Sequence, residues 1–200
     1  YGGVQGDFSD RRCNEFGGAA EARGVVCLHQ IVVVSLKGHT FGQCGLHEKR
    51  HGFLFCGDQI MTTIVPIVGS QQKDLGLLKC YMESLGDMKH RYADCRILPC
   101  HYGPIEDVEK EANRIILGYL DKCEIMKGIL EEDGGLMTTR DVGVRAYGRS
   151  QGPPDYRHFV SCTQIWAKTF SCLEFMYGEG LVERCEREGI IYWKRTEGAG

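Results

Sequence analysis

The sequence predicts a mixed α/β fold, and three observations support that prediction. Short runs of β-branched and aromatic residues fill the first half of the 200-residue chain and are separated by turns containing glycine. Residues 105–130 repeat apolar side chains every three or four positions, which is typical of an amphipathic helix. The last third has the pattern of two helices followed by two short strands. Strands that alternate with helices in this way are typical of α/β domains.

Three strands are expected before the long helix. Residues 31–34, Ile-Val-Val-Val, form the longest apolar run and predict a buried strand within residues 25–36. Residues 53–55, Phe-Leu-Phe, predict a second strand that ends at Gly57. Residues 95–98 predict a third strand that ends at Pro99. Each predicted strand is therefore followed by a turn.

Helices and a domain boundary complete the predicted order. Apolar residues at helical spacing predict a helix at 74–85, and residues 1–24 predict a loop with a short helix at 18–22. Gly134-Gly135 ends the long helical pattern, so we expect one domain at 1–131 and a second at 132–200. The second domain should hold a short helix at 138–147 capped by Thr138 or Thr139, and a longer helix after Pro153-Pro154. With strands at 181–185 and 190–194, this order predicts a small winged helix.

Composition excludes several classes of protein. The chain is 42% apolar and 26% charged, which is typical of globular proteins, and its net charge of −3 gives no general attraction to nucleic acid or anionic lipid. No apolar run approaches the roughly 20 residues that a membrane-spanning helix needs. The 11 cysteines are odd in number and include no C-x-x-C pair. They indicate reduced thiols and a cytoplasmic protein, with the mitochondrial matrix as the alternative.

The turns that follow the three predicted strands carry His39, Asp58 and His101. Glycines near each of them give the backbone the freedom to approach an ion. Two imidazoles and one carboxylate suit a divalent metal such as zinc, so we predict that these three residues are metal ligands. Cys44 and Cys100 flank two of the candidates; we expect both to be buried, unreactive thiols, with metal binding as the alternative.

The same turns resemble the later metal motifs of the metallo-β-lactamase superfamily. The resemblance rests on three motifs in matching order, with a helix between the second and the third: Gly38-His39-Thr40-x-Gly42, Leu54-Phe55-x-Gly57-Asp58 and Leu98-Pro99-x-His101-x-Gly103-Pro104. The long helix and winged helix that follow are similar to the subgroup around β-lactamase-like protein 2. The resemblance thus extends over essentially the whole chain.

The resemblance implies the C-terminal part of an αββα sandwich at 1–131 and a two-zinc site in a longer protein. His39 would bind one zinc ion, Asp58 would bridge both, and His101 would bind the second. It also implies hydrolysis of an ester, thioester, amide or phosphodiester by a metal-activated water. No catalytic residue is expected in this chain, because the water-orienting Asp of the family belongs to a His-x-His-x-Asp-His motif. That motif is absent and Tyr1-Gly2-Gly3 resembles its continuation, so we expect an inactive fragment truncated just after it.

Three positions depart from the family pattern. Gln43 stands where relatives often have His, and Cys100 and Tyr102 replace glycines on either side of His101. A Cβ at those two positions restricts the turn.

Three functions remain open at this point. They are an ester or thioester hydrolase, a single-strand endoribonuclease, and a non-catalytic binding protein if the chain truly begins at Tyr1. The expected partner is a small ester or thioester, or RNA, with no membrane; a homo-oligomer is left open. DNA binding is disfavoured, because nine Lys or Arg stand against ten Asp or Glu from Glu132 onward.

Overall fold

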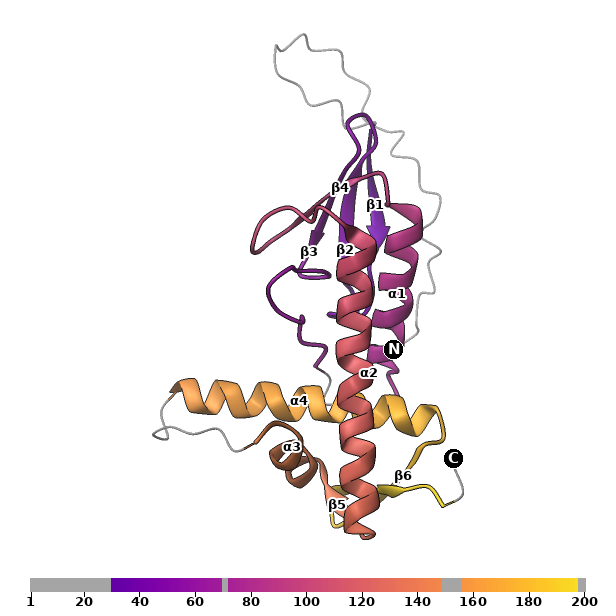
Figure 1. Cartoon of the computed structure of the whole chain (residues 1–200), viewed down its shortest axis with the longest axis vertical. Helices are drawn as coiled ribbons and strands as arrows, with labels where there is room; N and C mark the ends of the chain where they lie inside the picture. The colour runs from indigo at the N-terminus through magenta and orange to yellow at the C-terminus, as the bar shows by residue number, and fades with distance from the viewer. Residues whose placement is uncertain (1–29, 70–71, 149–155, 198–200) are drawn as a thin grey trace, which may run out of the picture.

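The structure is a computed structural model that describes residues 30–69, 72–148 and 156–197. The helix expected at 18–22, the residues Tyr1-Gly2-Gly3 and Pro153-Pro154 lie outside the described residues. The elements follow one another along the chain as shown in Figure 1: β1 (Ile31–Ser35), β2 (Cys44–Glu48), β3 (Phe53–Gly57), α1 (Leu77–Arg91), β4 (Arg96–Pro99), α2 (Val108–Asp133), β5 (Met137–Thr138), α3 (Thr139–Tyr147), α4 (Tyr156–Gly178), β6 (Val182–Arg187) and β7 (Ile190–Arg195).

The first four strands form one sheet in the order β1-β2-β3-β4. β1 pairs antiparallel with β2, β2 antiparallel with β3, and β3 parallel with β4. The sequence prediction missed β2, because Cys-Gly-Leu-His-Glu contains no β-branched or aromatic residue. By reversing the chain, β2 makes β1, β3 and β4 run in the same direction, and all three end at one edge of the sheet.

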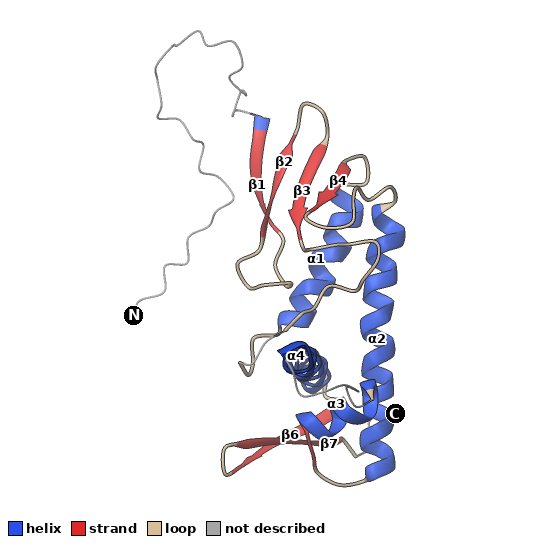
Figure 2. Ribbon diagram, turned by 90° about the vertical axis from the view of Figure 1, so that its left-hand side faces the viewer, coloured by secondary structure: helices blue, strands red, loops and turns tan. Residues whose placement is uncertain are grey.

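Helices α1 and α2 cover one face of this sheet (Figure 2). Leu54 and Ile97 point into the core on that face and are fully buried, whereas Val33 on the opposite face is 66% exposed. The prediction of a buried strand at 31–34 is therefore wrong, because β1 lies at the sheet edge and its outer face is uncovered by any described residue. Strands β1–β4 with α1 and α2 thus form one sheet layer and one helical layer, in a mixed α/β arrangement.

Both long helices begin later than the apolar pattern predicted. Asp74 and Gly76 have φ angles of 62° and 57°, outside the helical region, so α1 begins only at Leu77. Ile105 forms a β-bridge with Ile97 instead of a helical turn. Asp107 then caps α2 by accepting a hydrogen bond from the backbone N–H of Lys110, 2.9 Å away.

The C-terminal elements have the predicted order of helix, helix and two strands. Thr138 accepts a hydrogen bond from the backbone N–H of Asp141, so the predicted cap of α3 is confirmed. β6 and β7 form a hairpin whose turn, Glu188-Gly189, has positive φ at both residues. β5 adds a third strand beside β7, and the fully buried Trp193 donates a hydrogen bond to the Thr139 hydroxyl.

Helix α2 contacts α1, α3, α4 and strand β7, with α4 lying crosswise to it (Figure 1). One continuous core runs from Leu36 to Trp193. Arg184 of β6 pairs with Glu174 and with Asp74, which lies 110 residues earlier.

The boundary between the two expected domains, at residues 131/132, stays a prediction. No described helix is both long and apolar enough to cross a membrane.

Nine cysteines lie among the described residues, and no disulfide joins any of them. Cys123 and Cys172 are buried between helices, as apolar-face positions predict. Cys44 and Cys100 are exposed. The expectation that these two thiols are buried is therefore wrong, because they lie on β2 and the β4 turn beside faces that the helices do not cover.

Candidate metal centre

The three predicted ligands lie in loops at one edge of the four-stranded sheet. His39 lies in the β1–β2 loop, Asp58 directly follows β3, and His101 follows β4 by two residues. Since β1, β3 and β4 point the same way, their C-terminal ends meet at this edge. The backbone N–H of Cys100 donates to the carbonyl of Gly57 over 3.1 Å and joins the last two loops.

Asp58 lies between the two histidines and presents one oxygen to each. The distance is 3.8 Å from its Oδ2 to His39 Nε2 and 3.6 Å from its Oδ1 to His101 Nε2. Both distances exceed the usual length of a hydrogen bond. They resemble the separation of about 3.4 Å between two donors that each lie about 2.1 Å from one tetrahedral ion. The spacing therefore fits side chains that share a metal ion better than side chains that share a proton.

Two polar atoms of this group are left without partners inside the protein. His39 Nδ1 and Asp58 Oδ1 are both buried and neither has a hydrogen-bond partner. Most buried polar atoms are satisfied, so orphaned ones point to a missing ion, water or chain. Within the described ranges, no group of three or more His, Cys, Asp or Glu side chains is placed to hold a metal ion. The role of His39, Asp58 and His101 as ligands therefore stays a prediction.

The loop that carries His39 is pressed against helix α1. Gly38 has φ 129°, and a Cβ built on it would lie 2.2 Å from the Cα of Tyr81. The loop is closed at its base by a 3.0 Å hydrogen bond from the N–H of Leu36 to the carbonyl of Gln43. Only glycine permits this close approach of loop and helix.

Gln59 ties the Asp58 loop to its surroundings, and sequence reasoning missed it. Its side chain is fully buried and donates to the Lys37 carbonyl over 3.3 Å and to Ser84 Oγ over 3.0 Å. The Tyr81 hydroxyl donates to the Gln59 carbonyl over 2.7 Å. The position of Gln59 directly after Gly-Asp and before an apolar pair was the available signal, although its Oε1 is buried without a hydrogen-bond partner among the described residues.

Gln43 supports the end of β3. Its Nε2 donates to the carbonyl of Cys56 over 3.0 Å and lies 2.8 Å from a Cβ built on Gly57, whose φ is 59°. Gln43 stands where the family often has His, and it holds the end of β3 that precedes Asp58.

Burial raises the pKa of the Cys56 thiol to about 12, so Cys56 stays protonated and is a poor metal ligand.

The loop that carries His101 is less supported. The His101 side chain is 62% exposed, and the next residue, Tyr102, has φ 72°. The expected restriction of this turn is thus observed, because Tyr102 occupies a conformation that favours glycine. Tyr102 is itself 56% exposed and leans toward the His101 ring, with 6.2 Å between ring centroids.

Comparison with solved structures identifies the fold. No protein-family model and no curated protein matches the sequence. A metallo-β-lactamase family protein from Thermus thermophilus superposes with a TM-score of 0.67 at 23% identity, over 83% of this chain and 49% of its own. A β-lactamase domain protein from Burkholderia ambifaria superposes with a TM-score of 0.71 at 22% identity, over 83% of this chain and 48% of its own.

The chain therefore has the fold of metallo-β-lactamase family proteins. It spans about half the length of the two solved structures that it matches. At this level of identity the likeness concerns the fold alone, and the metal, the reaction and the substrate are matters of proposal.

Proposed function

We propose that this chain is part of a metal-dependent hydrolase and that His39, Asp58 and His101 bind divalent metal, with zinc as the best fit. The observation that carries the proposal is the position of Asp58 between two imidazoles, with a different oxygen 3.6–3.8 Å from each. Imidazole and carboxylate donors are the set that zinc prefers at hydrolytic sites.

Bound zinc would supply a Lewis acid and a water acidic enough to act as a nucleophile near neutral pH. The residues of this chain supply the geometry around it. His39, Asp58 and His101 would hold the metal, and Gln59 holds the Asp58 loop against α1. The 200 residues contain no His-x-His-x-Asp-His motif, so we expect them to bind metal weakly and to lack the residue that orients the water.

An ester or thioester is the proposed substrate class. A net charge of −3 gives little attraction for the phosphates of single-stranded RNA, which usually bind to clustered Arg and Lys. We further propose that α3, α4 and the β6–β7 hairpin form a winged helix with a structural role. The packing of α4 against α1, α2 and α3 supports this role, since a helix that reads DNA needs a free face.

Zinc affinity, measured by competition with a chromophoric chelator, tests the metal site on this chain directly. His39→Ala and Asp58→Asn should each weaken binding by about tenfold or more, since each removes one donor. His51→Ala is the matched control, because His51 is 62% exposed and lies beside Glu48 and Phe53 rather than beside a candidate ligand. Equal affinity in the wild type, His39→Ala and Asp58→Asn would refute the ligand assignment.

The reaction is tested on the longer protein that contains this chain. A thioester panel should be turned over with zinc, and turnover should be lost in Asp58→Asn. Cleavage of single-stranded RNA with no thioester turnover would instead support the endoribonuclease, and failure with both substrates would support a non-catalytic role.

A further inference from the structure

The segment between Asp58 and α1 packs along the N-terminal half of α2. The Tyr119 hydroxyl donates to the Pro66 carbonyl over 2.6 Å and accepts from the Val68 N–H over 2.8 Å. A Cβ built on Gly118 would lie 3.5 Å from the side chain of Val65. These contacts fix to the helix the end of the segment that lies farther from Asp58.

Arg114 of α2 holds the end of the segment that lies nearer to Asp58. Its Nη2 atom donates to the carbonyl of Met61 over 2.7 Å and to that of Ile64 over 3.4 Å. Met61 follows Asp58 by three residues and is 4% exposed. Because a carbonyl of a buried residue needs a donor, the guanidinium both satisfies this backbone and ties it to α2.

Glu111 orients the guanidinium from one turn earlier on the same helix. Arg114 Nε donates to Glu111 Oε2 over 2.7 Å, and the Glu111 side chain is 15% exposed. The bond is charge-assisted, which makes it stronger than a bond between neutral groups. Arginine carries its donors in one planar fork, so Nε can bind the carboxylate while Nη2 binds the loop. A lysine ammonium has no such fork.

The helix that carries Arg114 begins just after the turn that carries His101. The N–H of Ile105 donates to the carbonyl of Ile97 over 2.9 Å and fixes this connection to β4. Asp107 then caps α2, and Arg114 follows about two turns later. Helix α2 is therefore joined to the His101 side of the candidate metal centre at its start and to the Asp58 side through Arg114.

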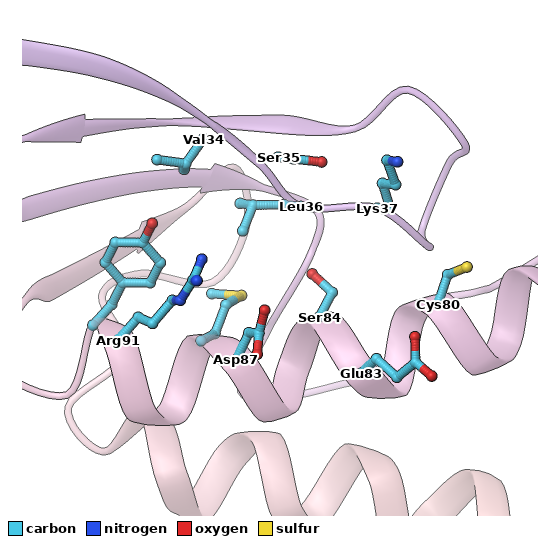
Figure 3. A pocket seen from close by; sticks show the side chains of 11 residues that line it. Val34, Ser35, Leu36, Lys37, Cys80, Glu83, Ser84, Asp87 and Arg91 are labelled. Atoms are coloured by element: carbon cyan, nitrogen blue, oxygen red, sulfur yellow. The ribbon is translucent and has the colours of Figure 1, made fainter. Parts of the chain in front are cut away.

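On its other side, the Asp58 loop is bonded to α1. The Gln59 amide donates to the Lys37 carbonyl and to Ser84 Oγ. Lys37 and Ser84 face each other across the groove of about 580 Å³ between the β1 segment and α1 (Figure 3). Asp58 thus lies next to two anchors, Gln59 toward α1 and Arg114 toward α2.

We propose that Arg114 is a positioning residue of the candidate metal centre. By tying the Met61 carbonyl to α2, it keeps Asp58 at its separation from His101, which is 3.6 Å from Oδ1 to Nε2. This role rests on the proposed binding of metal by Asp58 and His101. Arg114 acts through the backbone of residues 59–61 and exchanges no proton with the site.

Zinc affinity of the 200-residue chain, measured by competition with a chromophoric chelator, tests this role. Arg114→Ala should weaken binding by about tenfold, as is usual when a group that orients a metal ligand is removed. Arg114→Lys should weaken it less, since the ammonium can bind the carbonyl or Glu111 but does not span both.

Tyr119→Phe is the matched control, because it removes two hydrogen bonds from the far end of the same segment. It should lower the midpoint of urea unfolding and leave zinc affinity unchanged. An equal loss of zinc affinity in Tyr119→Phe and Arg114→Ala would indicate general loosening of the segment and would overturn the positioning role.

Hydrogen exchange on the metal-free chain gives a second readout. In Arg114→Ala the amides of residues 60–64 should exchange faster than in the wild type, whereas those of β3 should keep their rates. Wild-type exchange of residues 60–64, or wild-type zinc affinity, would overturn the proposal. If Arg114→Ala does not fold, Arg114→Lys and Arg114→Gln are compared with the wild type in the same two measurements.

Asp58→Asn in the same series distinguishes this role from the metal site itself. If Asp58→Asn weakens zinc binding and Arg114→Ala does not, only the positioning role fails. If Asp58→Asn binds zinc like the wild type, the ligand assignment fails and the positioning role fails with it.

Discussion

The loops that carry Asp58 and His101 end neighbouring parallel strands, yet the protein supports them very differently. Around Asp58, the side chains of Gln43, Gln59 and Tyr81 make hydrogen bonds that fix the backbone on both sides of the carboxylate. His101 is 62% exposed, and Tyr102 beside it is held in a left-handed conformation. One half of the candidate metal centre is thus preorganised by the core, whereas the other half is carried by an exposed and strained turn.

The difference lies in how each loop is packed. The Asp58 and His39 loops are built against α1. The His101 side chain is mostly exposed. The following predictions test that contrast, from the largest expected effect to the smallest.

Gly38→Ala should have the largest effect. The new Cβ would lie 2.2 Å from the Cα of Tyr81, and φ at this position is 129°. Overpacking and backbone strain together should lower the free energy of unfolding by about 2–6 kcal/mol, as measured by urea denaturation. Gly42→Ala in the same loop is the matched control, because nothing lies within 4 Å of its Cβ. Similar losses in both variants would contradict the close packing of the His39 loop on α1.

Gln59→Ala should be the next largest. The change leaves the Lys37 carbonyl and the Ser84 hydroxyl without a partner and opens a small cavity, so we expect a loss of about 2–3 kcal/mol. Zinc affinity should fall as well, since the Asp58 loop loses its anchor. Thr63→Ala, at an exposed position four residues later, should change neither quantity. Unchanged stability of Gln59→Ala would show that the Asp58 loop is not held by this amide.

The thiol of Cys56 should make stability depend on pH in the alkaline range. Burial raises its pKa from the ordinary value of 9.0 to about 12 in the folded state, so the protonated thiol favours folding. That contribution is fully present below pH 9.0 and is lost as the pH rises from 9.0 toward 12. Cys56→Ala should therefore reduce the slope of unfolding free energy against pH in this window. Cys100→Ala, at an exposed thiol, should leave the slope as it is.

Tyr102→Gly should have the smallest effect, and it should be stabilising. Glycine accepts φ 72° without the cost that a Cβ brings, which is worth about 1 kcal/mol. Tyr102→Phe keeps the Cβ and should have no effect on the midpoint of thermal unfolding. If Tyr102→Gly is also neutral or destabilising, the turn that carries His101 is not strained.

Some features of the fold could be predicted from local pattern alone. The long helix α2, the α3 cap at Thr138 and the β6–β7 hairpin were predictable, because apolar spacing, a capping hydroxyl and a turn sequence each act within a few residues. The strand β2 was not, because its residues have low β-propensity and it forms through pairing with β1 on one side and β3 on the other.

For the candidate metal centre, too, the sequence determined some features and the tertiary structure determined others. By itself the sequence determined which residues end the three strands, and so which turns carry His39, Asp58 and His101. Only the tertiary structure decided that these turns meet at one edge, that Gln43 and Gln59 hold two of them, and that β1 lies uncovered. The physical reason is that periodicity and turn chemistry are local, whereas burial and hydrogen-bond partners depend on segments that are distant in the chain.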